Sequence, residues 1–356
     1  MKNFFEPHIQ NLKNLIPQGR QSRSLGLDIG ATGIKLIEIE KKDAVLQIVN
    51  WKVEPYGPDE KSQSLKALLS NLNLSSPIVS AISGKGTLIR YVDLPSMSPS
   101  EARQSFLLEI DKYFPFPQDQ IYVDCFIVDN RRSDKKMTVL VAAAKKDLID
   151  QKVQIFTELG ISIKALTLNS VAIDNVFYFF PSVEKKDKEQ DSPQEGSFAY
   201  AVLDIGESVS SLNILVNQTP VFTRDIFVGG GEMTRSVSNS LGISLAEAEK
   251  LKCSPGEKLS EVSSATESVL NHLISEVRLS FDYFATEKNA HVSKIFLTGG
   301  ASLFVGVTEA FVHQFDIPVH RWKISEVVKI AEGLDVVEID KNSGQLAVAL
   351  GLALMG

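Results

Sequence analysis

A pattern that occurs twice, about half a chain length apart, constrains the fold more than any other feature of this sequence. Residues 25–40, LGLDIGATGIKLIEIE, read as an apolar strand that ends in Asp-Ile-Gly, followed by a glycine turn and a second strand. Residues 198–226 repeat this order, with Asp204 in the place of Asp28. A repeat of this length predicts two related lobes, each built on a sheet of its own.

Each repeat places one carboxylate inside an apolar strand, directly before a turn that contains glycine. An ionised carboxylate is costly away from water unless a cation or hydrogen-bond donors compensate it. Glycine turns allow backbone N–H groups to converge on an anion, and an aspartate beside such a turn can hold a hydrated Mg²⁺. Two further glycine turns follow, at 229–231 and 299–300. Together, the four turns and the two aspartates favour a polyphosphate bound between the lobes.

The composition argues against several other kinds of protein. The chain has 356 residues, of which 44% are hydrophobic, which is enough for two domains. Its net charge of −7 disfavours a general attraction to nucleic acid. The two cysteines lie far apart and the five histidines form no HxxxH or HExxH pattern, so we expect reduced thiols and no zinc site. No apolar run reaches the roughly 20 residues that a membrane span needs.

Breaks in the hydrophobic pattern suggest the domain organisation. The first strands of the first lobe are followed by a unit with a separate strand-helix-strand-strand pattern. Pro115 and Pro117 end the helix of this unit. The charged segment 181–197 reads as a solvated loop or hinge. We therefore expect an N-terminal tail (1–23), a first lobe (24–196) with an inserted subdomain at about 84–163, a second lobe (197–340) and a C-terminal helix (341–356) that closes onto the first lobe. Apolar residues in the tail fit one face of a short helix, which could contact a membrane or a partner, pack on the body, or belong to a loosely ordered segment.

In this order, the motifs resemble the actin-like ATPase superfamily, which includes sugar kinases, DnaK-type chaperones, actin and FtsA. Four further stretches make the sequence similar to the PilM family of type IV pilus assembly: KYFPFPQDQIYVDCFIV (112–128), RDIFVGGGEMT (224–234), GISLAEAEKLK (242–252) and LTGGASLFVG (297–306). The resemblance implies an α/β fold, namely the two-lobed actin-like ATPase fold with duplicated RNase H-like lobes and an FtsA-type inserted subdomain.

The resemblance also implies a role for each site residue. Asp28 and Asp204 would hold Mg²⁺, Asp28 through water. The nucleotide, ATP or ADP, would contact a first phosphate turn (Gly30, Ala31, Thr32, Gly33 and Lys35), a second phosphate turn (Asp204 and Gly206), a glycine turn near the α/β phosphates or ribose (Gly229, Gly230 and Gly231), a pair near the ribose and base (Glu249 and Lys252) and an adenine turn (Gly299, Gly300 and Ala301).

Two departures from the superfamily pattern bear on hydrolysis. Glu207 stands in the second phosphate turn, where many relatives have another glycine, and a carboxylate there would repel a triphosphate unless it points away. Thr167 and Asn169 occupy the segment between the lobes where many relatives have acidic residues. We therefore expect nucleotide binding with weak or absent ATP hydrolysis, and assign no catalytic residue.

Three functions compete at this point. The resemblance implies a binding module that holds the N-terminal cytoplasmic tail of the inner-membrane protein PilN, at the cytoplasmic face of the bacterial inner membrane, and links this membrane platform to the motor. It leaves contacts with motor ATPases and with further copies of the chain open, and implies membrane association only through partners. The alternatives are an FtsA-like filament-forming ATPase and a small-molecule kinase of the sugar-kinase type, although phosphoryl transfer needs a base beside an acceptor site and neither is evident.

Overall fold

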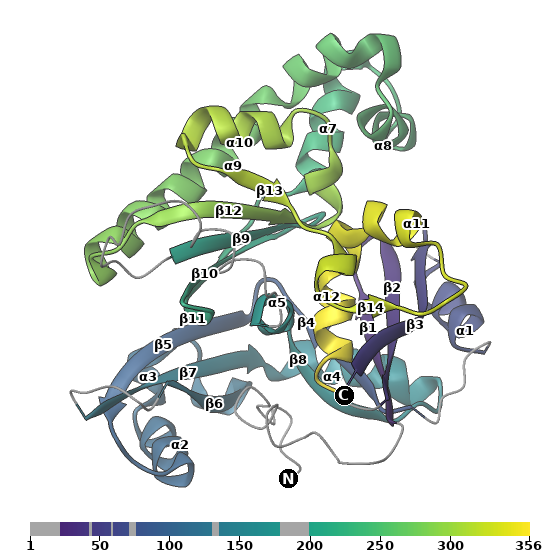
Figure 1. Cartoon of the computed structure of the whole chain (residues 1–356). Coiled ribbons are helices and arrows are strands. Elements are labelled where there is room, and N and C mark those ends of the chain that lie inside the picture. The colour runs from purple at the N-terminus through teal and green to yellow at the C-terminus, as the bar shows by residue number, and fades with distance from the viewer. Residues whose placement is uncertain (1–21, 43–44, 58–59, 71–75, 130–134, 179–198) are drawn as a thin grey trace.

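The computed structural model describes residues 22–42, 45–57, 60–70, 76–129, 135–178 and 199–356. The expected tail helix and the expected hinge at 181–197 lie outside these ranges. Within them, the chain forms two large sheets and one smaller sheet, each with helices packed against it (Figure 1).

The first lobe is built on a six-stranded sheet in the order β14-β3-β2-β1-β4-β8. Its strands are β1 (Ser22–Ile29), β2 (Gly33–Lys42), β3 (Val45–Pro55), β4 (Ile78–Ile82), β8 (Ile163–Leu168) and β14 (Lys329–Ile330). β1, β2 and β3 are antiparallel neighbours, whereas β4 runs parallel to β1 and β8 runs parallel to β4. β14 pairs with β3, so part of the range assigned to the second lobe from the sequence adds a strand to the first.

The second lobe repeats this topology. Its strands, in the order β11-β10-β9-β12-β13, are β9 (Ala199–Ile205), β10 (Ser210–Val216), β11 (Thr219–Ile226), β12 (Val292–Thr298) and β13 (Val319–Arg321). The directions match as well, because β9, β10 and β11 are antiparallel neighbours while β12 and β13 continue the sheet in parallel. The structure confirms the duplicated lobes that the repeat predicts.

A smaller antiparallel sheet lies between β4 and β8 in the chain, at the lower left of Figure 1 beneath β11. It consists of β5 (Thr87–Pro95), β7 (Lys136–Lys145) and β6 (Ile121–Asp129), covered by α2 (Pro99–Leu108) and α3 (Ile110–Tyr113). Ser98 caps α2 with a capping box that includes Glu101, as its sequence predicts. The helix expected before Pro115 and Pro117 is interrupted at Glu109, so that α2 and α3 are separate, and α3 ends before the prolines.

The remaining helices cover the two large sheets. They are α1 (Lys61–Ser70), α4 (Lys146–Glu158), α5 (Asn169–Tyr178), α7 (Gly230–Leu241), α8 (Leu245–Cys253), α9 (Leu259–Lys288), α10 (Val307–Phe315), α11 (Val336–Lys341) and α12 (Ser343–Ala353). Within the described residues, none of the helices combines the length and apolar character that a membrane crossing requires.

The C-terminal helix α12 joins the two lobes. Its residues are buried, and its side chains share one hydrophobic cluster with strands of both large sheets, including Ile37 and Phe296. Close approach depends on glycine, since a Cβ atom on Gly351 would overlap the backbone of Ala172 in α5. The first residues of α12 are tied to the second lobe, because the carbonyl of Gly344 accepts hydrogen bonds from that lobe.

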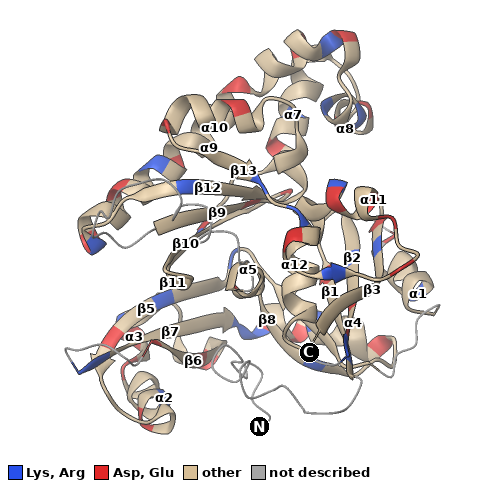
Figure 2. Ribbon diagram, in the orientation of Figure 1, with Lys and Arg blue, Asp and Glu red and all other residues tan. Residues whose placement is uncertain are grey.

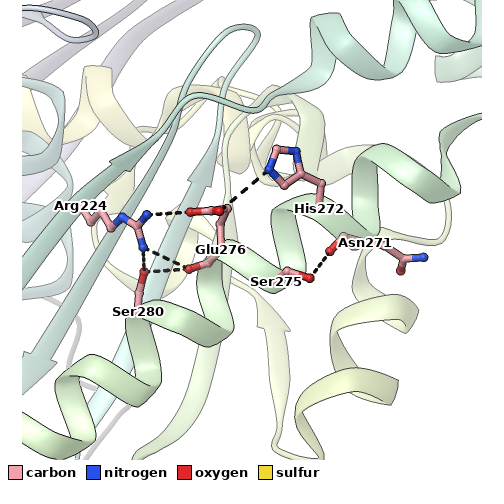
Figure 3. A network of polar contacts seen from close by, with 6 residues as sticks. All are labelled: Arg224, Asn271, His272, Ser275, Glu276 and Ser280. Carbon is pink, nitrogen blue, oxygen red and sulfur yellow. Dashed lines mark hydrogen bonds and ion pairs between the residues drawn. The ribbon is translucent and has the colours of Figure 1, made fainter.

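A polar network fixes the outer strand of the second lobe to its longest helix (Figure 3). Arg224 on β11 forms an ion pair with Glu276 of α9 at 2.6 Å and donates a hydrogen bond to Ser280 at 3.0 Å. His272 lies 3.9 Å from the other carboxylate oxygen of Glu276. Because these contacts involve two turns of α9, they restrict how β11 can move relative to that helix.

Candidate functional site

A cavity of about 1020 Å³ lies between the two large sheets, and both Asp-Ile-Gly turns open onto it. The predicted site residues that line it are Asp28, Gly30, Ala31, Thr32, Lys35, Asp204, Gly206, Glu249, Lys252, Gly299, Gly300 and Ala301. The predicted residues that do not line it are Gly33, Gly229, Gly230 and Gly231. The fold therefore brings most of the predicted residues to one place.

The first turn connects β1 to β2. The N–H of Gly30 donates to the carbonyl of Gly33 at 3.0 Å, which closes the hairpin, and the hydroxyl of Tyr56 donates to the carbonyl of Gly30. Lys35 pairs with Asp28 in the antiparallel register, and its Nζ lies 3.8 Å from Oδ2 of Asp28. Gly33 instead faces β3, where a Cβ atom would lie 2.9 Å from the carbonyl oxygen of Glu54.

The second turn has the same hairpin geometry, since the N–H of Gly206 donates to the carbonyl of Val209 at 3.1 Å. Asp204 is buried beneath it. Burial and the neighbouring Asp28 raise the pKa of Asp204 to about 7, although Lys35 opposes this shift. Asp28 on β1 and Asp204 on β9 line the same cavity from different lobes.

The triple glycine at 229–231 supports the second turn from behind. The N–H of Gly230 donates to the carbonyl of Gly206 at 2.9 Å, and the N–H of Gly231 donates to the carbonyl of Glu207 at 2.8 Å. A Cβ atom on Gly229 would lie 2.6 Å from both carbonyl oxygens. These glycines let α7 begin directly against the turn, and their expected approach to the phosphates or ribose stays a prediction.

Glu207 turns its carboxylate toward the start of α7. A Cβ atom on Gly231 would overlap this carboxylate, which lies close to the buried ammonium of Lys252. Burial raises the pKa of Glu207, and Lys252 opposes the shift. A carboxylate is stabilised at a helix N-terminus by the helix dipole, so Glu207 is held at α7 rather than directed across the cavity, although it contributes to the cavity wall.

Lys252 and Glu249 form a fixed pair on α8. Lys252 is 4% exposed, and its Nζ lies 2.6 Å from Glu249, 2.9 Å from the hydroxyl of Thr234 and 3.2 Å from the carbonyl of Gly230. Burial raises the pKa of Glu249, but hydrogen bonds from Lys252 and Thr234 outweigh it and lower this pKa overall. Lys252 thus anchors the α8 wall, and Glu249 presents the more exposed group to the cavity.

The turn after β12 passes closely behind the end of β9. Gly299 has a φ of +85°, and a Cβ atom there would overlap the backbone of Ile205. Its N–H donates to the carbonyl of Gly344 at 2.9 Å. The fourth glycine turn is therefore fixed between β9 and the start of α12, with Gly300 and Ala301 facing the cavity.

The sequence model of the family described as type IV pilus assembly protein PilM matches residues 26–356. This chain belongs to the PilM family. Among solved structures, the "PilM-PilN type IV pilus biogenesis complex" aligns with a TM-score of 0.80 and 22% identity over 93% of this chain and 97% of that chain. The ethanolamine utilization protein EutJ from Carboxydothermus hydrogenoformans aligns with a TM-score of 0.51 and 14% identity over 98% of this chain and 95% of that one. These likenesses confirm the two-lobed actin-like fold.

In this PilM-family chain, the cavity wall also includes residues that sequence reasoning missed. Lys152 on α4 is 9% exposed, and its Nζ lies 3.3 Å from the carbonyl oxygen of Ile29, beside the first turn. Ser83, Gly84 and Lys85, after β4, and Phe227, after β11, line the cavity as well. No local sequence pattern predicts a role for Lys152. The Gly-Lys-Gly sequence at 84–86, in contrast, is a pattern from which a tight turn at the cavity could have been predicted.

Among the described residues, the segment formed by β8 and α5 contributes no carboxylate to the cavity wall. Asn169 contributes to the wall at the start of α5, and Thr167 is buried on β8. A water-orienting acid, which the sequence also fails to supply here, would have to come from elsewhere in the wall.

Acidic and basic positions both occur on the helices and strands of the two lobes, as Figure 2 shows for the described residues. The expectation, drawn from the net charge of −7, that the protein does not attract nucleic acid in general stays a prediction.

We predict that Asp204→Asn stabilises the nucleotide-free and metal-free protein at neutral and alkaline pH. The raised pKa of Asp204 means that the folded state binds its proton more tightly than the unfolded state does. The free energy of unfolding of the wild type should therefore fall as the pH rises from about 4 to about 7, and the variant should avoid a penalty of about 4 kcal/mol.

Urea unfolding at several pH values in EDTA measures this difference. Asp282→Asn, which changes an exposed aspartate on α9, is the matched control and should follow the wild type. A difference between Asp204→Asn and the wild type that does not grow between these pH values would contradict the assignment.

Proposed function

We propose that this chain binds an adenine nucleotide with Mg²⁺ between its lobes and holds the N-terminal cytoplasmic tail of PilN, at the cytoplasmic face of the inner membrane. One observation carries the nucleotide part of this proposal. Asp28 and Asp204, each beside a glycine turn of a different lobe, line the same cavity. A cavity of about 1020 Å³ is large enough for a nucleotide, since small-molecule sites measure roughly 300–1,000 Å³.

The two carboxylates suit Mg²⁺. This ion prefers oxygen ligands and is commonly held by one or two carboxylates together with phosphate oxygens and water. Burial and the neighbouring Asp28 raise the pKa of Asp204, and a divalent cation nearby would favour its ionised form. Bound Mg²⁺ would neutralise phosphate charge. Lys35, beside Asp28, supplies a further positive charge at the first turn.

The remaining wall suits the nucleoside. Gly300 and Ala301 leave a flat backbone surface at the turn after β12, and Glu249 offers a carboxylate that could accept hydrogen bonds from ribose hydroxyls. Lys252 holds Glu249 in place from within the wall. Positions 167 and 169 hold Thr167 and Asn169 where many relatives have acidic residues. This difference supports nucleotide binding with weak or absent hydrolysis.

The PilN part of the proposal is supported by family membership and by the overall likeness to the solved PilM-PilN complex. We place the tail beside the inserted subdomain, where β5 meets β11 of the second lobe through a contact of 3.0 Å between the hydroxyls of Tyr91 and Thr223. A nucleotide that contacts both lobes would favour one arrangement of this junction, so its binding can change the affinity for the tail.

We predict that Asp28→Ala weakens binding of Mg-ATP about tenfold or more, because it removes one of the two carboxylates that would face the metal and leaves Lys35 without its ion-pair partner. Isothermal titration calorimetry measures the affinity. Asp282→Ala, on the exposed side of α9, is the control and should bind as the wild type does. Unchanged affinity in Asp28→Ala would remove Asp28 from the site.

We also predict that removal of the inserted sheet abolishes capture of the PilN tail. Thr87 on β5 and Ala144 on β7 are paired neighbours, so residues 88–143 can be replaced by two glycines without separating the flanking chain. Fluorescence anisotropy with a labelled peptide of the tail measures capture. Binding of Mg-ATP within about threefold of the wild type would show that the lobes still fold, and normal peptide binding by such a variant would place the tail elsewhere.

A further inference from the structure

The loop that joins β4 to β5 reads Ser-Gly-Lys-Gly-Thr and opens onto the cavity. Its two glycines, Gly84 and Gly86, have φ values of +103° and +114°, which side chains other than glycine rarely adopt. The N–H of Thr87 donates to the carbonyl of Gly84 at 3.1 Å. The loop is therefore a tight turn that projects Lys85, an exposed residue, at the edge of the cavity.

The sheet places this loop beside the first turn. β4 runs parallel to β1 with Ser80 opposite Leu27, so the carboxyl ends of both strands reach the same edge of the sheet. In open α/β sheets, ligands bind at this edge. The loop and the first turn thus form neighbouring parts of one wall.

The duplication gives the loop a counterpart. In the second lobe, β12 runs parallel to β9 with Thr298 opposite Asp204, and the turn after β12 is the one proposed to face adenine. The loop after β4 holds the equivalent position in the first lobe. A nucleotide has a base at one end and its terminal phosphate at the other. If the base lies at the turn after β12, the terminal phosphate is the group that would lie near the loop after β4.

The loop contacts the second lobe directly. The N–H of Gly84 donates to the carboxylate of Asp225, which also accepts a hydrogen bond of 2.6 Å from Ser211. The Nζ of Lys85 lies over the ring of Phe227, 5.5 Å from its centroid. Phe227 is 45% exposed and lines the cavity, on a segment that leads from β11. Arg224, fixed to α9, keeps the end of β11 in place (Figure 3).

The balance of charge in the cavity also favours a role for Lys85. The charged side chains in the wall are the carboxylates Asp28, Asp204, Glu207, Glu232 and Glu249 and the ammonium groups Lys35, Lys85, Lys152 and Lys252. Lys35 lies beside Asp28, and Lys252 lies beside Glu249. The carboxylates at least balance the ammonium groups, so the wall offers a polyphosphate no net positive charge, and binding requires cations from the metal and from a lysine that can turn toward it.

We propose that the Ser83–Thr87 loop is a third phosphate-binding element and that Lys85 pairs with the terminal phosphate of a nucleoside triphosphate. The proposal rests on the proposed nucleotide function and extends it. Without nucleotide, the ammonium lies on the ring of Phe227. A cation–π contact at an exposed site is weaker than a charge-assisted pair with phosphate, so a triphosphate draws Lys85 away from the second lobe. Because the loop continues into β5, this step conveys the presence of the terminal phosphate to the inserted subdomain.

Calorimetry with Mg-ATP and Mg-ADP tests the assignment in the full chain. Lys85→Met should weaken binding of Mg-ATP about tenfold and of Mg-ADP less than about twofold. Lys85→Arg, which keeps the charge, should retain most of the ATP affinity. Lys146→Met is the matched control, since Lys146 also lies over an aromatic ring, 5.6 Å from the centroid of Tyr122, but does not line the cavity. It should bind both nucleotides as the wild type does.

The outcomes separate this proposal from the one on which it rests. Wild-type affinity for Mg-ATP in Lys85→Met, or an equal loss for Mg-ATP and Mg-ADP, overturns the role of Lys85 and leaves the nucleotide site intact. A wild type that binds neither nucleotide overturns both proposals. Selective loss of Mg-ATP binding in Lys85→Met, with recovery in Lys85→Arg, supports the terminal-phosphate contact.

Discussion

The interaction between Asp28 and Asp204 across the cavity is the constraint on which the rest of the structure depends. In the metal-free protein, burial raises the pKa of Asp204 and the like charge of Asp28 raises it further, because both make the ionised carboxylate less favourable. Lys35 offsets part of this effect from the first lobe. A divalent cation with a polyphosphate would offset more, and would make the closed arrangement of the lobes dependent on its ligand.

The fold brings these carboxylates together through α12. This helix packs against β1 and α5 through small residues, and its first turn accepts hydrogen bonds from Thr298 and Gly299 of the second lobe. A buried apolar cluster around α12 contains side chains from both large sheets. The lobes therefore meet at a packed centre on one side, while β5 and β11 meet on the other. The cavity lies between these two contacts, so a structural change at either contact would alter the position of the cavity wall.

Much of the fold could be predicted from local sequence. The repeat predicts both hairpins, because hydrophobic alternation and glycine turns act between neighbouring residues. The cap at Ser98 follows from the same local rules. The pairing of β14 with β3 could not be predicted, since two residues carry no periodicity and their partner lies far away in the chain. The break in the inserted helix at Glu109 likewise has no local signal.

The site was predictable in its outline, while the roles of individual residues were not. Which face of a glycine turn meets the cavity depends on where the next helix packs, and Gly229 to Gly231 face Gly206 and Glu207 instead. Lys252 is expected to reach the ribose and base with Glu249, yet the packing of α7 against α8 buries it within the wall. The contact of Lys85 with Phe227 joins two lobes, so no pattern along one strand or helix contains it.

Hydrogen exchange measured by mass spectrometry, with and without Mg-ATP, tests most directly whether one ligand is held by both repeats. The amides of residues 30–33 and 206–209 should become protected together when Mg-ATP is added, because the same phosphate chain contacts both turns. Protection of only one turn, or of neither at a saturating concentration, would contradict the account.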